Sequence, residues 1–205
     1  MESSRAFDDR WPRIMLGASR DTPIPADFDG DGMADPAVFR GVDGKIRVSE
    51  SAAGTVWMSA FGDTSWKPAV GDYNGDGLDD AAWFVPANRT IFVVYSDADN
   101  TVRGDNPQAT FGPFGARRDD IPVRGDFDGD GTDDPAAFRV ADGKIRVMES
   151  GTGVRWTSTY GNRDWLPAVT DYNGDGQDDL AWFMPTVRAF LVVLSDADNK
   201  DRTDN

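Results

Sequence analysis

Four short acidic segments place oxygen donors at regular spacing along this sequence. They occupy residues 27–35, 72–80, 126–134 and 171–179, here called acidic loops 1 to 4, and each reads D-x-D/N-x-D-G-x-x-D. Short oxygen-bearing side chains on alternate positions of a tight turn can converge on one point, and the glycine at the sixth position permits the sharp bend. Calcium takes six to eight such oxygens at about 2.3–2.6 Å. The pattern therefore predicts about four calcium ions, one in each loop.

The expected side-chain ligands are the first, third, fifth and ninth residues of each loop. They are Asp27, Asp29, Asp31 and Asp35; Asp72, Asn74, Asp76 and Asp80; Asp126, Asp128, Asp130 and Asp134; and Asp171, Asn173, Asp175 and Asp179. Fourteen of them are carboxylates, nearly the whole formal net charge of −15. Without ions each loop would pack like charges together, which is destabilising. Metal binding should therefore be linked to folding.

The EF-hand is a poorer match to these loops. An EF-hand loop needs a glutamate at its twelfth position, where this chain has Val38, Trp83, Ala137 and Trp182. Magnesium prefers to keep several of its waters, which makes it a weaker candidate than calcium. Ordinary acidic turns without a metal remain the alternative.

Composition excludes several functional classes. The acidic balance argues against nucleic acid, which is bound largely through Lys and Arg. The 205 residues include no Cys and no His, so thiolate zinc sites are excluded and the commonest general base is absent. We therefore expect no catalytic residues and no enzyme. No apolar stretch is long enough for a membrane span.

Localisation is indicated only indirectly. Residues 1–9 show no signal peptide, although the segment could have been cut from a longer precursor. Calcium loops in this number suit the calcium-rich outside of a cell, so an extracellular or cell-surface location is expected.

The chain is a doubled pair of repeats. Loops 1 and 3 are 99 residues apart, as are loops 2 and 4. Residues 27–100 align with 126–199 without a gap at roughly two-thirds identity. The order is therefore A-B-A′-B′, where the A loops begin D-F-D and the B loops begin D-Y-N.

Each repeat has the pattern of four short strands. In the third repeat the strands are expected at 121–123, 135–139, 144–148 and 154–160, separated by the acidic loop and by turns such as Asp142–Gly143. In the second they are expected at 69–70, 81–85, 90–96 and 108–111, with an exposed polar loop at 97–106. Four strands in about 45 residues is the size of a propeller blade.

The whole chain, 1–205, is therefore predicted to be all-β, a single β-propeller domain of four four-stranded blades. The blades are expected at about 22–62, 67–112, 121–161 and 166–196. The last repeat lacks a fourth strand, and residues 13–17 precede loop 1 as the end of a blade should. We expect this N-terminal strand to close the last blade.

The repeats resemble the FG-GAP/VCBS family, the calcium-loop blades of integrin-α-type propellers. The residues that carry the resemblance are Phe61-Gly62, Phe111-Gly112 and Tyr160-Gly161, with 121–131 and 137–139. The resemblance implies a loop between the first two strands of each blade, and a role in extracellular binding or cell adhesion with structural calcium. It also implies a backbone carbonyl ligand at the seventh position of each loop, from Met33, Leu78, Thr132 and Gln177. Propellers of that type usually have seven blades, whereas four are present here.

Tryptophans form repeat-related pairs. Trp83 and Trp182 lie in apolar strands and are predicted to pack in the core. Trp66 and Trp165 lie in connections between blades, where a sugar-stacking role and a packing role are about equally favoured.

Three functions remain open at this stage. The first is a calcium-stabilised binding or adhesion module with a protein or glycan ligand. The second is a lectin-like propeller or the non-catalytic part of a carbohydrate-active enzyme. The third is an architectural or engineered repeat scaffold without a ligand. A monomeric ring is preferred over a dimer that exchanges its ends.

Overall fold

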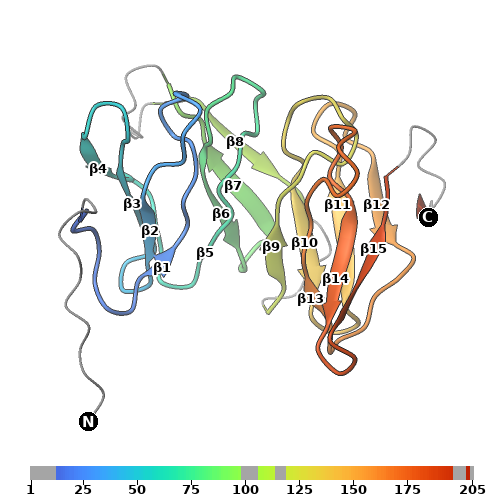
Figure 1. Ribbon diagram of the computed structural model, residues 1–205. Coiled ribbons are helices and arrows are strands. Elements are labelled where there is room, and N and C mark those ends of the chain that lie inside the picture. Colours follow the sequence, from blue (N-terminus) through green and yellow to red (C-terminus); the bar gives the residue numbers. More distant parts are fainter. Residues whose placement is uncertain (1–12, 98–105, 114–118, 196–201, 204–205) are drawn as a thin grey trace, which may run out of the picture.

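The fold is all-β. The computed structural model describes residues 13–97, 106–113 and 119–195, and the backbone of 202–203 (Figure 1). These residues contain no helix, and so none of the length and apolarity of a membrane span. The predicted loop at 97–106 and the segment 1–12 lie largely or wholly outside the described part.

Four antiparallel sheets form the blades. Blade 1 contains β1 (Thr22–Pro23), β2 (Ala37–Arg40), β3 (Lys45–Ser49) and β4 (Val56–Met58). Blade 2 contains β5 (Lys67–Pro68), β6 (Ala81–Val85), β7 (Thr90–Val94) and β8 (Gln108–Phe111). Blade 3 contains β9 (Ile121–Val123), β10 (Ala136–Arg139), β11 (Lys144–Met148) and β12 (Arg155–Ser158), with β16 (Arg202–Thr203) added beside β12. Blade 4 contains β13 (Leu166–Pro167), β14 (Leu180–Met184) and β15 (Ala189–Val193).

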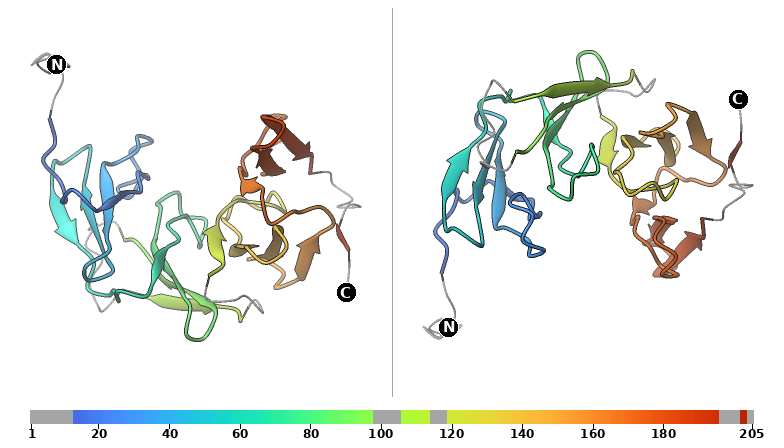
Figure 2. Two further views of the ribbon diagram at one scale, coloured as in Figure 1. Left: turned by 90° about the horizontal axis from the view of Figure 1, so that it is seen from below. Right: turned by 90° about the horizontal axis from the view of Figure 1, so that it is seen from above.

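The blades are arranged as a four-bladed β-propeller. In Figure 2 they follow one another along an arc, so that blade 1 and blade 4 lie at its two ends. The first strands of blades 1 to 3 lie nearest the middle, where residues 24–26, 68–70 and 122–124 line a shared pocket. The predicted fold class is confirmed.

Hairpin chemistry sets the register inside each blade. The pattern Lys-Ile-Arg-Val in β3 alternates half-buried and buried side chains, as expected for a strand with one face in the core. The turn before β3 contains Gly44, whose φ of 71° favours glycine. A side chain there would also meet the backbone of Asp63 at 2.0 Å. Gly143 repeats this arrangement against Asn162.

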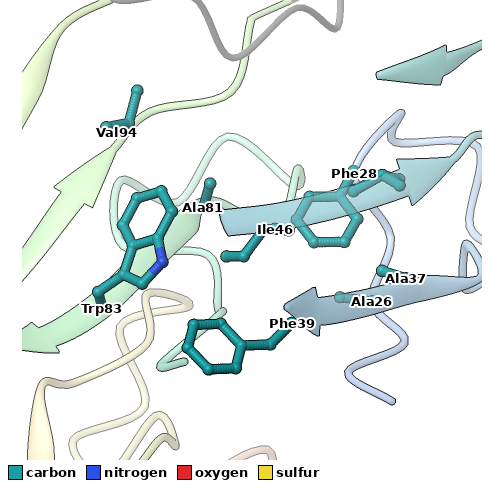
Figure 3. Close-up of a cluster of buried hydrophobic side chains, with 9 residues drawn as sticks. Ala26, Phe28, Ala37, Phe39, Ile46, Ala81, Trp83 and Val94 are labelled. Atoms are coloured by element: carbon teal, nitrogen blue, oxygen red, sulfur yellow. The ribbon is translucent and has the colours of Figure 1, made fainter. Parts of the chain in front are cut away.

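The core consists of three apolar clusters, each between successive blades. Blade 1 contributes Phe28, Phe39 and Ile46 to the first cluster. Blade 2 contributes Trp83 and Val94, which lie on the face of blade 2 that is turned toward blade 1 (Figure 3). The second cluster joins blades 2 and 3, and the third joins blades 3 and 4. An inner blade therefore packs one face against the preceding blade and the other face against the following blade. Its stability depends on both neighbours.

Two tryptophans bind the A–B pairs together. The indole N–H of Trp83 donates to the carbonyl oxygen of Gly44 over 2.8 Å, and Trp182 makes the same bond to Gly143 over 2.9 Å. Both tryptophans are fully buried. Their predicted role in core packing is confirmed, and the hydrogen bonds add a polar link to the preceding blade.

The N-terminal closure of the last blade is not seen. Residues 13–17 lie in no strand, and blade 4 is a three-stranded sheet within the described residues. The physical reason is that blades 1 and 4 stand at opposite ends of the arc, so the N-terminal segment is far from β15 (Figure 2). The added strand of blade 3, β16, was not expected from the sequence.

Replacement of Trp83 by phenylalanine tests the polar link. The change keeps an aromatic ring but leaves the buried Gly44 carbonyl without its donor, so we expect a loss of about 1–3 kcal/mol in the free energy of unfolding. Trp182→Phe should cost a similar amount, and the exposed control Val42→Ala should cost little. Equal stability of all three variants in denaturant titrations would contradict the proposed role.

Candidate functional site

The acidic loops connect the first and second strands of every blade. Loop 1 runs from β1 to β2, and loops 2, 3 and 4 occupy the same place in their blades. In loops 1, 2 and 4 an antiparallel bridge closes the base, pairing Ala26 with Asp35, Gly71 with Asp80 and Thr170 with Asp179. In loop 3 the backbone N–H of Asp134 donates to the Gly125 carbonyl over 2.7 Å. The loops are thus held at matching positions by the blade frame.

The first aspartate organises each turn. In loop 1 the Asp27 carboxylate accepts the backbone N–H groups of Gly30 and Gly32 over 2.7 and 2.8 Å. Both glycines have positive φ values, 72° and 82°, so the donors point inward where other residues would be strained. The first aspartates of the other three loops accept the same two bonds. This explains the glycines at the fourth and sixth positions.

The ninth aspartate ties the loop to the body of its blade. Asp35 is fully buried, and its two oxygens accept the backbone N–H groups of Phe28 over 2.9 Å and Ser51 over 2.6 Å. Asp80, Asp134 and Asp179 are also fully buried and make the corresponding pairs of bonds. The buried acid therefore fixes the loop to the segment that follows the third strand.

The third and fifth residues face the open side of the loop. In loop 1 the Asp31 carboxylate accepts the Met33 backbone N–H, and Asp29 accepts that of Asp31. In loops 2 and 4 the amide of Asn74 or Asn173 donates to the fifth-position carboxylate, that of Asp76 or Asp175. The A and B loops thus share a backbone form and differ by one charge.

The donors of loops 1 and 3 are placed closely enough to fit a hard divalent cation. Single carboxylate oxygens of Asp27, Asp29 and Asp35 lie within 4.8 Å of one another, as do those of Asp126, Asp128 and Asp130. Such separations match oxygens placed around one ion at about 2.3–2.6 Å. All the side-chain donors are oxygens, which calcium prefers. The expected carbonyl ligands Met33, Leu78, Thr132 and Gln177 occupy equivalent positions, and the N–H of each donates to its fifth-position aspartate.

A further set of aspartates, missed by the ligand pattern, joins neighbouring loops. Asp133, the eighth residue of loop 3, accepts the Asp72 backbone N–H over 2.9 Å, and its own N–H donates to the Asp72 carbonyl over 2.7 Å. Asp79 makes this reciprocal pair with Asp27, and Asp178 makes it with Asp126. We call these three residues the linking aspartates. The doubled Asp-Asp at the end of loops 2, 3 and 4 is their signal in the sequence.

The linking aspartates fit closely against the preceding loop. A side chain on Gly71 would meet Asp133 at 2.3 Å, and one on Gly125 would meet Asp178 at 2.8 Å. Arg124 adds charge at the middle junction, with its guanidinium 2.6 Å from Asp79 and 3.6 Å from Asp133. Loop 1 has Ala34 at this position and no linking carboxylate.

Burial sets the electrostatics of these acids. Desolvation raises the pKa of Asp80 and that of Asp134 to about 7, against the opposing effect of their backbone hydrogen bonds. Desolvation also raises the pKa of Asp133 to about 6, although Arg124 acts to lower it. In the metal-free chain these carboxyl groups are therefore costly to ionise at neutral pH.

The two candidate sugar-stacking tryptophans are half-buried. Trp66 packs on Trp83 and Phe92, with ring centroids 5.9 and 5.8 Å apart. Trp165 packs on Trp182 with centroids 6.3 Å apart. Each ring thus packs against the core, and each residue keeps part of its surface accessible to solvent.

Comparison with known proteins supports the fold. No family model and no curated protein matches the sequence. Solved structures do match, among them a lectin of Agrocybe aegerita studied for its specific recognition of non-reducing terminal N-acetylglucosamine. The TM-score is 0.55 at 18% sequence identity, over 80% of this chain and 47% of the lectin. The match therefore spans about half of the lectin and shows a shared fold.

Removal of a linking aspartate tests the junction between loops. Asp133→Ala leaves the Asp72 N–H without its acceptor and Arg124 without one carboxylate, so we expect a loss of about 1–3 kcal/mol in the free energy of unfolding. Asp43→Ala, which removes a half-buried carboxylate that pairs with Arg40 and accepts the Lys45 backbone N–H, serves as the control and should cost less than about 1 kcal/mol. If chemical denaturation gives equal losses for both variants, Asp133 does not link the blades.

Proposed function

We propose that this chain is a non-enzymatic, calcium-stabilised β-propeller that binds glycans outside the cell, built from FG-GAP/VCBS-type repeats. The observation that carries the proposal is the propeller arrangement shared with a lectin, together with four equivalent loops whose donors are all oxygens. Of the three functions left open by the sequence, the carbohydrate-binding one has this structural support.

Calcium has a structural role in the proposal. The candidate ligands are built into the base of each blade, and the ninth aspartate of each loop is fully buried. Burial makes the charged form of these carboxylates unfavourable. A bound ion would offset the charges of three or four of them at once. Ligand binding is assigned to other surfaces, because a bound ion would occupy the acidic side chains.

The glycan surface is placed at the half-buried tryptophans. Sugar rings stack on flat aromatic faces, and a ring held rigidly by neighbouring aromatics loses little conformational freedom on binding. Trp66 and Trp165 meet both conditions, since each packs on a buried tryptophan and remains partly accessible. The 99-residue repeat would give two equivalent sites on one chain.

Metal removal tests the structural role of calcium. We expect the melting temperature at pH 8 to fall strongly when calcium is removed and to recover when it is added back. The folded-state pKa values of about 7 for Asp80 and Asp134 lie above the ordinary 3.8. Their protonated forms stabilise the metal-free fold at low pH, and this contribution is lost as the pH rises toward 7. Stabilisation by calcium should therefore be larger at pH 8 than at pH 5.

Two outcomes would count against structural calcium. The first is a melting temperature that is the same with and without calcium at pH 8. The second is a calcium effect that does not change between the two pH values. The variant Asp80→Asn serves as a control, because it should weaken the pH dependence of the metal-free chain.

Glycan binding is tested separately on an array that includes N-acetylglucosamine-terminated glycans. We expect binding that weakens at least tenfold in Trp66→Leu and in Trp165→Leu, because leucine keeps apolar contact with the core but cannot stack on a sugar. Trp57→Leu is the matched control, since Trp57 lies in β4 and is also half-buried, with its ring packed against Phe28. Calcium-dependent melting without binding to any glycan would retain the stabilising role of the loops and reject the lectin function.

A further inference from the structure

One face of blade 4 is apolar and only partly buried. The corresponding face of blade 2 consists of six residues that are all buried, namely Ala69, Tyr73, Ala82, Phe84, Ile91 and Val93. Their counterparts 99 residues later are Ala168, Tyr172, Ala181, Phe183, Phe190 and Val192, here called the blade 4 face. Tyr172 is 44% exposed where Tyr73 is 3%, and Phe190 is 56% exposed where Ile91 is 0%. Of the six, Ala181 alone is buried.

The internal repeat shows what kind of surface covers such a face. The face of blade 2 is covered by an A-type blade, blade 3, which contributes Ala137 from β10 and Met148 from β11. The other A-type blade is blade 1, where Val38 and Ser49 stand at the same positions of β2 and β3. Blade 1 of the same chain lies at the opposite end of the arc (Figure 2).

Loop 4 also presents an unmatched half of the junction between loops. In loops 1 to 3 the first aspartate is bonded through its backbone to the eighth residue of the next loop. Asp171 makes no such pair within the described residues. Gly30, Gly75 and Gly129 each lie against the seventh residue of the next loop, whereas a side chain on Gly174 would meet nothing within 4 Å.

We propose that a second copy of this chain covers the blade 4 face with the outward side of its blade 1. A two-fold axis would apply the same contact twice, and the two chains would form one closed ring of eight blades in the order A-B-A′-B′. The new junction is of the B-to-A kind that joins blades 2 and 3. It would remove the exposed aromatic side chains of blade 4 from water, the main favourable term in such association.

The residues at this junction are mutually consistent. Blade 1 has Pro25 and Ala34 where blade 3 has Arg124 and Asp133. Blade 1 therefore lacks both the counterpart of the Arg124 guanidinium and the counterpart of the Asp133 carboxylate with which it pairs. Thr170 stands where blade 2 has Gly71, which must be small because Asp133 approaches it closely. With alanine at position 34 there is room for the threonine, and the Ala34 N–H can still donate to the Asp171 carbonyl.

The test is the mass of the full chain in solution, measured by light scattering in calcium buffer over a wide range of concentrations. We expect a mass near twice 22.3 kDa that falls toward the single-chain value on dilution. Phe190→Asp should weaken the dimer at least tenfold, because it places a charge on the blade 4 face. Val154→Asp, on the exposed outer part of blade 3, should leave the dimer unchanged.

A variant on the partner surface identifies the contact. Val38→Asp, at a half-buried side chain that lies beside Gly17 of its own chain, should weaken the dimer as Phe190→Asp does, and a dimer that survives it would overturn the assignment to blade 1. A mass of 22.3 kDa at all concentrations would overturn the proposal outright. Leu194→Asp provides a second change on blade 4, at a side chain that is exposed in the single chain. The melting temperature of the Leu194→Asp variant should equal that of the dilute wild-type chain.

Discussion

The reciprocal hydrogen bonds of the linking aspartates hold the blades in register. A blade is a small sheet of two- to five-residue strands, and within the described residues no sheet joins one blade to the next. Apolar packing joins the faces of blades but is not directional. The bonds between Asp72 and Asp133, and their counterparts at the other two junctions, supply the direction. They fix each acidic loop against its neighbour, so the loops and the blades share one frame.

The same arrangement concentrates negative charge where the blades meet. Each loop has three or four ligand carboxylates, and the linking aspartates add one more at three of the four positions. The chain offsets part of this charge with backbone N–H groups that glycines turn inward, as around Asp27. Burial still raises the pKa of Asp80, Asp134 and Asp133. A cation in each loop would relieve this cost at neutral pH, which is why we propose a structural role for calcium.

Much of the fold could be predicted from the sequence, because its signals are local and repeated. Strands β6, β8, β9 and β11 have the predicted bounds, since their ends are marked by the acidic loops and by Gly-containing turns. The relation between blades could not be predicted in the same way. Repeat spacing predicts the closure by residues 13–17, but it says nothing of whether the first and last blades meet. The doubled Asp-Asp marks Asp79, Asp133 and Asp178 in the sequence, but it does not show what these residues bond to, because their partners lie 52 to 61 residues away.

If each acidic loop binds a metal ion where neighbouring blades meet, each chain should take up one calcium ion per loop. Titration calorimetry of the metal-free chain with calcium measures this stoichiometry, which is independent of any glycan and of the number of chains in the ring. We expect about four calcium ions bound per chain. Protons should be released at neutral pH, because the carboxyl groups whose pKa is raised must ionise to bind metal. Absence of calcium binding, or binding of a single ion per chain, would refute this role of the loops.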